Sequence, residues 1–127
     1  MNLNNKKAVL KIEDVHKVFF PGTVDEVQAL QGVNIEVHDG DFICIIGSNG
    51  AGKSTALNVV AGVFPPEKGG KVFINQKDVT RLPEYKHAAF VGRVWQQPGV
   101  GTAANLSIEE NLSMAVMRGK KRGLKMA

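Results

Sequence analysis

Apolar and polar positions divide the first third of the chain into short strand-like stretches separated by turns. Residues 8–20 (AVLKIEDVHKVFF) place valine and isoleucine among charged residues in an imperfect alternation, which predicts a half-exposed antiparallel strand. Residues 27–30 and 33–37 are two further short strand candidates, and residues 21–23 (PGT) predict the turn before them. This region therefore favours antiparallel pairing.

The next stretch is a continuous apolar run, followed by a glycine-rich segment and a helix. Residues 42–46 (FICII) predict a strand buried on both faces of a parallel sheet, with Cys44 as a small buried residue within it. Residues 54–62 supply apolar positions for a helix that Gly62 ends.

Later segments predict further short elements. Residues 71–74 (KVFI) indicate a strand closed by a turn at residues 75–76, and residues 78–83 are expected to be irregular. Residues 84–89 predict one short helical turn, and residues 90–96 (FVGRVWQ) predict another strand.

A last helix is marked by a capping box. Ser107 and Glu110 have the spacing at which each side chain satisfies a free amide of the other residue. The helix is expected to run to about Arg118. Its apolar face consists of Ile108, Leu112, Ala115 and Val116.

The glycine-rich segment between the apolar run and its helix carries the main chemical signal. Residues 47–54 (GSNGAGKS) fit the pattern G-x-x-x-x-G-K-[ST] of a phosphate-binding P-loop. Its glycines allow consecutive N–H groups to converge on a phosphate, and the following helix adds free N–H donors and a positive dipole end. The predicted phosphate-binding residues are Gly47, Ser48, Asn49, Gly50, Ala51, Gly52, Lys53, Ser54 and Thr55.

Individual roles in the loop follow from side-chain chemistry. Lys53 carries a compact charge on a long stem that suits the β- and γ-phosphate oxygens of a nucleotide. Ser54 offers a hydroxyl to Mg²⁺, and Thr55 is expected to hydrogen-bond another phosphate oxygen. The competing interpretation, a surface turn with a stray lysine, is disfavoured by the predicted strand before the loop and the helix after it.

Composition sets the limits for these predictions. The 127 residues are enough for one domain with a core, and 43% are hydrophobic. The net charge of +4 suits an acidic ligand such as a nucleotide, but also nucleic acid or an anionic membrane surface. A single cysteine favours a reducing cytoplasm, and no apolar run is long enough for a secretory signal or a spanning helix, so a soluble chain is expected.

The order of these features resembles the ATP-binding subunit of ABC transporters over about residues 10–119. The resemblance rests on the antiparallel region, the P-loop and the segment VWQQP at residues 94–98. It implies an α/β fold: a partial P-loop NTPase core with an N-terminal antiparallel β-subdomain and the start of a helical subdomain. The segments GTVDEVQALQGVNIEV, GSNGAGKST, GRVWQQP and NLSIEENLSMAVMRG look most like ATPases of bacterial uptake systems for amino-acid-like or similar small solutes.

The resemblance also divides the chain, taking residues 1–127 as the N-terminal part of a single ABC-type ATP-binding domain. The antiparallel β region covers about 1–40 and 70–90. The P-loop core covers 41–64 and 90–97, and the helical subdomain begins over 105–120.

Two site residues outside the P-loop are implied by the resemblance, together with ATP and Mg²⁺ as cofactors. Phe19 matches the aromatic that stacks on adenine, with Phe20 as the alternative; without the family, Phe19 is a core phenylalanine of a β-sheet. Gln96 matches the Q-loop glutamine that contacts the metal and the γ-phosphate; without the family it is a polar strand end. Gln97 departs from the Asp or Glu that many members carry there.

Several family motifs have no match in the sequence. The Walker B strand with its Asp-Glu pair and the LSGGQ signature are missing, and His16, His38 and His87 are interpreted as surface or turn histidines. The chain is therefore expected to be a fragment or truncated product that holds nucleotide and hydrolyses ATP very slowly or not at all. Loss of the Walker B strand is expected to leave residues 42–46 partly uncovered and prone to self-association.

The implied partners are transmembrane permease subunits, a second ATP-binding subunit in a homodimer and, indirectly, an extracytoplasmic solute-binding protein. They imply a cytoplasmic location on the inner face of the membrane, with no nucleic acid bound. The alternatives are a small P-loop kinase, a non-enzymatic nucleotide-binding module and a nucleic-acid-associated ABC-type ATPase. The last is prompted by a basic run of Arg118, Lys120, Lys121, Arg122 and Lys125.

Overall fold

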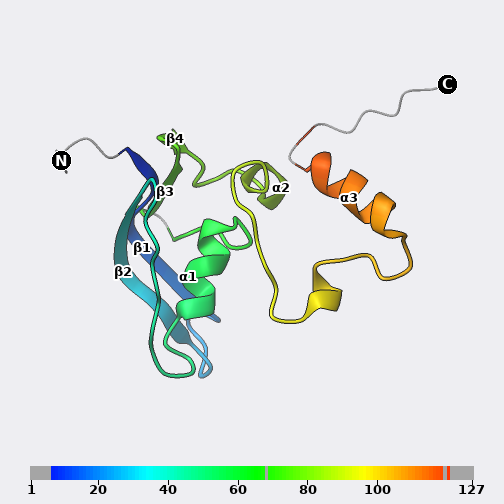
Figure 1. The fold of residues 1–127 in the computed structure, drawn as a ribbon. Helices are drawn as coiled ribbons and strands as arrows, with labels where there is room; N and C mark the ends of the chain where they lie inside the picture. Colours follow the sequence, from blue (N-terminus) through cyan, green and yellow to red (C-terminus); the bar gives the residue numbers. More distant parts are fainter. Residues whose placement is uncertain (1–6, 68, 119, 121–127) are drawn as a thin grey trace.

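A computed structural model describes residues 7–67, 69–118 and 120. It contains one antiparallel sheet of four strands in the order β2-β1-β3-β4 (Figure 1). The strands are β1 (Ala8–Phe19), β2 (Val27–His38), β3 (Lys71–Ile74) and β4 (Lys77–Asp78). The predicted N-terminal antiparallel region is confirmed, and the candidates at residues 27–30 and 33–37 form one continuous strand.

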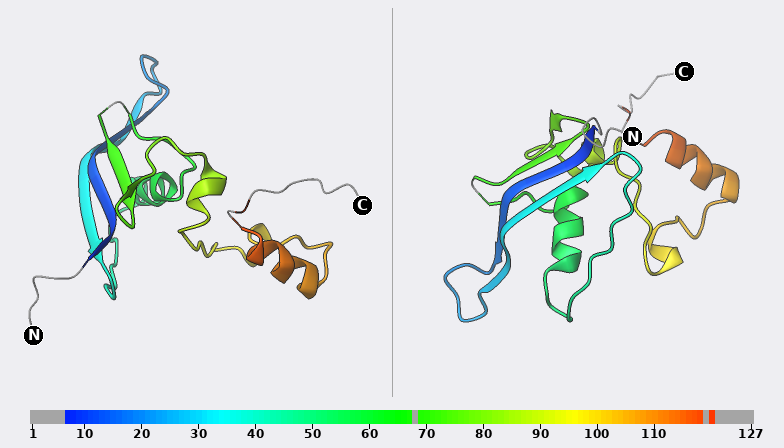
Figure 2. Two further views of the ribbon diagram at one scale, coloured as in Figure 1. Left: turned by 90° about the horizontal axis from the view of Figure 1, so that it is seen from above. Right: turned by 60° about the vertical axis from the view of Figure 1, so that its left-hand side comes forward.

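The helix that follows the glycine-rich loop packs on this sheet. α1 (Lys53–Val60) lies against one face of the long β1–β2 hairpin (Figures 1 and 2). It buries Ala56 and Val59 among apolar residues from the strands. The buried hydrophobic residues of the described chain are Ile12, Val15, Leu30, Ala56, Val59, Val72, Ile74 and Val79. The antiparallel sheet therefore supplies the surface on which the loop helix rests.

A β-bulge interrupts the β1–β2 pairing near its middle. Ile12 pairs with Ile35 and Val15 with Val33, so β1 contains one residue more than β2 between these pairs. The extra residue changes which face the later side chains of β1 occupy. Ile12 and Val15 are consequently both buried, at 3% and 1% exposure, although their spacing would place them on opposite faces of a regular strand.

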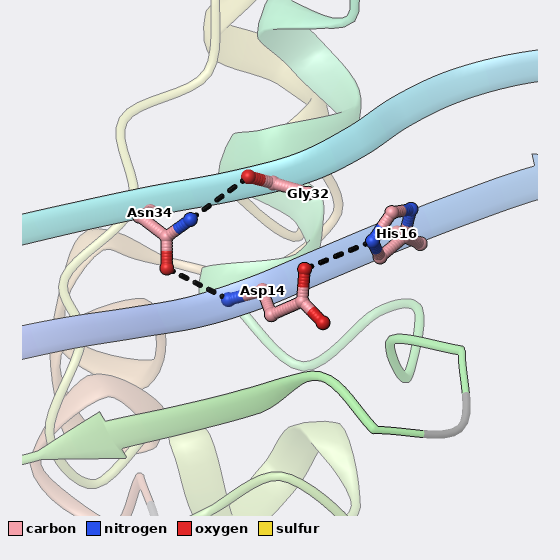
Figure 3. A network of polar contacts seen from close by, with 4 residues as sticks. All are labelled: Asp14, His16, Gly32 and Asn34. Carbon is pink, nitrogen blue, oxygen red and sulfur yellow. Dashed lines mark hydrogen bonds and ion pairs between the residues drawn. The ribbon is translucent and has the colours of Figure 1, made fainter.

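Polar side chains hold the backbone at this bulge (Figure 3). Asp14 has a φ of 45°, and its N–H donates to Asn34 Oδ1 at 2.9 Å, while Asn34 Nδ2 donates to the carbonyl of Gly32 at 2.9 Å. His16 Nε2 lies 3.0 Å from Asp14 Oδ1. The Asn34 side chain thus replaces a ladder hydrogen bond that the bulge removes.

The β3–β4 hairpin has the tight turn that the sequence predicts. Asn75 and Gln76 have φ values of 48° and 66°, and two successive positive φ values match the twist of a hairpin turn. β4 extends the pairing beyond the prediction through Lys77 and Asp78. α2 (Glu84–His87) confirms the short helical turn expected over residues 84–89.

The two strands predicted for a parallel core are wrong. Residues 42–46 and 90–96 form no strand, and Phe42 and Ile46 are each 92% exposed. Cys44, expected inside a strand, is exposed as well. A parallel strand needs neighbours for its backbone groups, and the described strands pair only with one another. Without such neighbours, apolar composition alone does not form a sheet.

The C-terminal helix stands apart from the sheet (Figures 1 and 2). It follows the short 3₁₀ turn η2 (Pro98–Val100), and α3 runs over Ile108–Val116, ending slightly before Arg118. The capping box is confirmed: the Glu110 N–H donates to Ser107 Oγ at 3.3 Å, and the Ser107 N–H donates to Glu110 Oε2 at 2.8 Å. None of its described residues is buried, so the cap, rather than packing, defines this helix.

Acidification is expected to weaken the start of α3. Hydrogen bonds from the Ser107 N–H and hydroxyl lower the pKa of Glu110. The stabilisation is therefore fully present above the ordinary glutamate pKa and is lost as the pH falls through the lower folded value. We expect the Ser107 amide resonance to move over that acid range, as measured by NMR. In Glu110→Gln, which keeps a neutral acceptor, this movement is expected to disappear, whereas in Glu109→Gln it stays; persistence in Glu110→Gln would contradict the assignment.

Candidate nucleotide-binding site

The glycine-rich loop brings the chain into α1 in a conformation that only glycine adopts easily. Gly50 and Gly52 have φ values of 83° and 80°, in the left-handed region. The carbonyl of Gly52, the N-cap residue, accepts the first helical hydrogen bond from the Ala56 N–H at 2.8 Å. In the described chain no side chain caps this helix. Its first N–H groups therefore remain available to an anionic ligand.

The loop rests directly on β2 at Gly52. A β-carbon at this position would overlap the carbonyl oxygen of Ala29 and lie 3.2 Å from Leu30 Cδ2. Leu30 is buried and pairs with Lys17 of β1. The missing side chain of Gly52 thus lets the phosphate-binding loop sit against the hairpin, which sets the position of the loop relative to the strands.

Lys53 folds back over the loop that precedes it. Its Nζ donates to the carbonyl oxygens of Gly47 at 2.7 Å and Ser48 at 2.6 Å. Lys53 is also the first residue of α1, where the helix dipole is positive. An ammonium group and unpaired backbone N–H donors therefore gather at one place, which is an arrangement suited to phosphate.

The two predicted metal contacts, Ser54 and Gln96, line the same cleft of about 620 Å³. The cleft lies between α1 and residues 91–97, and most of its other walls are apolar. Hydroxyl and amide oxygens are ligands that Mg²⁺ accepts while keeping several waters. The described residues contain no group of three or more His, Cys, Asp or Glu that would hold a metal. A cation here would consequently need the charge of a phosphate as well.

Phe19, the predicted adenine-stacking residue, is half-buried at the end of β1. Its ring meets the ring of Phe64 edge-on, with centroids 5.4 Å apart and an interplanar angle of 80°. Phe20, the alternative, is 66% exposed and has a φ of 52°. Phe19 therefore packs against a residue of the segment between α1 and β3, as its interpretation as a core residue requires, while the Phe20 ring extends toward solvent.

An ion pair holds the strand beside Phe19. Lys17 Nζ lies 3.1 Å from Glu67 Oε1, and the Val18 N–H donates to the same oxygen at 3.4 Å. The hydrogen bond from Lys17, with that from Val18, lowers the pKa of Glu67. Lys17 Nζ also lies 5.6 Å from the Phe19 ring centroid. These contacts join the end of β1 to the segment before β3.

A family model described as "ABC transporter" matches residues 30–126, which include the P-loop, the cleft and α3. The chain belongs to the ABC transporter family. It is 39% identical over 118 residues to the tyrosine transport ATP-binding protein of Clostridioides difficile, covering 92% of this chain and 46% of that one. The dipeptide transport ATP-binding protein DppD of Bacillus subtilis is 29% identical over 131 residues, covering 95% and 38%.

The cassette fold is confirmed by solved structures. One ATP-binding cassette, a dimer in a post-hydrolysis state bound to ADP and Pi, aligns with a TM-score of 0.72 and 25% identity. The alignment covers 91% of this chain and 50% of that cassette. The chain thus contains the antiparallel subdomain and a partial P-loop NTPase core, and it spans half or less of the length of these relatives.

The cleft of the ABC-type chain contains a stacked pair of side chains that was not predicted from the sequence. Arg93 Cζ lies 3.7 Å from the centroid of the Trp95 ring, a cation–π contact, and both residues line the cleft with Gln96. Arg93 Nη1 is buried and has no hydrogen-bond partner in the described chain. Side chains two residues apart lie on the same side of an extended segment. The spacing of Arg93 and Trp95 was therefore the feature of the sequence from which this pair could have been predicted.

The interpretation of His87 of the ABC-type chain as a surface or turn histidine is wrong as to the surface, while the residue does lie in the single helical turn α2. His87 is only 2% exposed, whereas His16 is exposed and His38 partly so. From α2 the His87 ring points inward, and its two nitrogens lie next to the backbone carbonyls of Val60, at the end of α1, and of Val79. These carbonyls take the place of the water that a polar ring would otherwise need. A single helical turn has too little periodicity to reveal which side faces inward.

Part of the basic run lies at the surface of the ABC-type chain. Arg118 and Lys120 of the basic run are exposed, whereas Lys121, Arg122 and Lys125 lie outside the described residues. Within the described ranges, no helix combines the length and apolar character needed to cross a membrane.

Proposed function

We propose that this chain binds the phosphates of ATP through residues 47–55, as the nucleotide-binding part of an ABC transporter ATPase. The observation that carries the proposal is the placement of the Lys53 ammonium, 2.7 and 2.6 Å from two loop carbonyls, beside the uncapped N-terminus of α1. Bound phosphate would accept hydrogen bonds from the Lys53 ammonium and from the first N–H groups of α1. The negative charge of the phosphate would strengthen each of these bonds.

The remaining proposed contacts to the nucleotide come from the cleft and from the end of β1. Ser54 and Gln96 would supply oxygen ligands to Mg²⁺ from opposite walls of the cleft, with phosphate providing the negative charge. Phe19, whose ring packs at a near-right angle to that of Phe64 and lies under Lys17 Nζ, would stack on adenine. When bound, Mg²⁺ would neutralise phosphate charge; the chain itself would hold and orient the nucleotide.

Family membership supports a role in powering solute uptake across a membrane. In this role the subunit would work on the cytoplasmic face with transmembrane permease subunits and a second ATP-binding subunit, and a solute-binding protein would act on the far side. Relatives named for tyrosine and dipeptide transport support small solutes as cargo. The solved cassettes that form dimers support pairing of two such subunits.

Calorimetry tests the proposed binding directly. Titrating the chain with ATP and Mg²⁺ is expected to give one-to-one binding that weakens when Mg²⁺ is omitted. Adenosine, which lacks the phosphates, is expected to bind far more weakly, since most proposed contacts are to phosphate. Equal affinity for adenosine and ATP would contradict phosphate binding at the loop.

The isolated chain is expected to hydrolyse ATP no faster than its own Lys53→Ala variant. Phosphoryl transfer requires a metal-binding Asp and a group that positions the attacking water, and the sequence contains no apolar strand followed by Asp-Glu to supply them. Phosphate release is measured with the purified chain and the variant side by side. Turnover that is lost in the Lys53→Ala variant would show that the chain assembles a complete catalytic site.

A further inference from the structure

The ring of His87 is held between two backbone carbonyl oxygens. Nδ1 lies 2.9 Å from the oxygen of Val60, and Nε2 lies 2.9 Å from the oxygen of Val79. A carbonyl oxygen only accepts hydrogen bonds, so both contacts are hydrogen bonds only when both ring nitrogens carry a proton. An imidazole with two N–H groups is the charged imidazolium form.

The carbonyl of Val60 is one that α1 leaves without a helical partner. Val60 is the last residue of α1, and beyond it the N–H groups of Gly62 and Val63 return to carbonyls of the final turn at 3.1 and 2.9 Å. These bonds do not use the Val60 oxygen. His87 therefore caps the C-terminus of α1, where the helix dipole favours a positive charge.

The surroundings show what favours and what opposes that charge. A β-carbon on Gly62 would lie 2.5 Å from His87 Cδ2, so the ring is closely enclosed and burial opposes charging. Arg81 lines the pocket at His87, and its positive charge also opposes a positive charge on the ring. The two carbonyls and the helix end favour it. The other charged residues of β4 and α2 are exposed: Lys77, Asp78, Glu84 and Lys86.

We propose that His87 is a positioning residue that fastens the end of α1, the P-loop helix, to the segment after β4 in its imidazolium form. Loss of the second proton would turn one N–H donor into a lone pair facing a carbonyl oxygen, and one of the two attachments would break. The attachment of the P-loop helix is consequently strongest at low pH and weakens as the pH rises. This inference does not depend on whether the loop binds ATP.

Two measurements on the full chain test the proposal. The first follows the ring ¹⁵N resonances by NMR, and at about pH 6 both nitrogens of His87 are expected to show the protonated state. The second compares chemical unfolding of the wild type, His87→Gln and the control His16→Gln. At about pH 6, His87→Gln is expected to reduce the folded-to-unfolded ratio about tenfold or more, and at about pH 8 the reduction is expected to shrink severalfold.

The control separates this effect from general titration. His16→Gln removes an exposed histidine whose contact is with the exposed Asp14 side chain, so its reduction is expected to be small at both pH values. A single neutral tautomer of His87 across the whole range would overturn the proposal, as would a deficit in His87→Gln that does not vary with pH. If His87→Gln fails to fold, the NMR titration of the wild type decides between the two forms.

Discussion

Replacing Lys53 with alanine is expected to weaken ATP binding about a hundredfold, which corresponds to about 2.7 kcal/mol. One ammonium group donating charge-assisted hydrogen bonds to phosphate oxygens accounts for a loss of this size. Among the described residues, the Lys53 Nζ bonds to carbonyls of its own loop, at Gly47 and Ser48. Because that part of the loop is exposed, water can replace these bonds, and thermal unfolding is expected to change little.

The affinity is measured by calorimetry with ATP and Mg²⁺ under the conditions used for the wild type. Lys86→Ala is the matched control, since Lys86 is an exposed lysine of α2. It removes the same charge from the chain without touching the loop. A loss shared equally by both variants would indicate a general charge effect, and an unchanged affinity in Lys53→Ala would contradict the proposed site.

Substituting Gly52 with alanine is expected to lower the free energy of unfolding by about 2–4 kcal/mol. Its φ of 80° alone makes an L side chain costly, by about 1–2 kcal/mol. The added β-carbon would also overlap the carbonyl of Ala29 and press on the buried side chain of Leu30. The loop must then move off β2, so the unfolding transition should occur at lower urea concentration.

Gly50→Ala separates the two contributions. Gly50 has almost the same φ, 83°, but nothing lies within 4 Å of the position its β-carbon would take. This variant is therefore expected to lose only the conformational part, about 1–2 kcal/mol. Equal losses in the two variants would mean that the loop does not rest on β2 as described.

The features predicted correctly from sequence are those fixed by nearby residues. The Ser107–Glu110 capping box depends on one turn of chain, and the turn at residues 75–76 is likewise local. The P-loop helix also follows from a contiguous pattern: α1 runs over residues 53–60, against a predicted 54–62. The antiparallel hairpin pairs strands adjacent in sequence, so little chain separates its partners.

The predictions that failed depend on distant partners. Residues 42–46 and 90–96 have strand composition, but their pairing requires neighbours that the described chain does not provide. The burial of His87 depends on carbonyls from α1 and from Val79, which no local pattern announces. The cleft that brings Ser54 and Gln96 together is equally a product of folding, and only family resemblance linked these two residues beforehand.

The bulge at Asp14 has a counterpart that limits how this hairpin can vary in length. Between the Val15–Val33 and Lys17–Leu30 pairs the extra residue belongs to β2, so this irregularity cancels the bulge at Asp14; two further register shifts lie nearer the two ends of the pairing. Deleting one residue from either strand would remove one of the two offsets and leave the other uncompensated. Every side chain beyond that point would then shift by one position in the pairing and turn to the opposite face of the sheet. Insertions and deletions in the middle of this hairpin should therefore be tolerated in matched pairs, one per strand, and selected against singly.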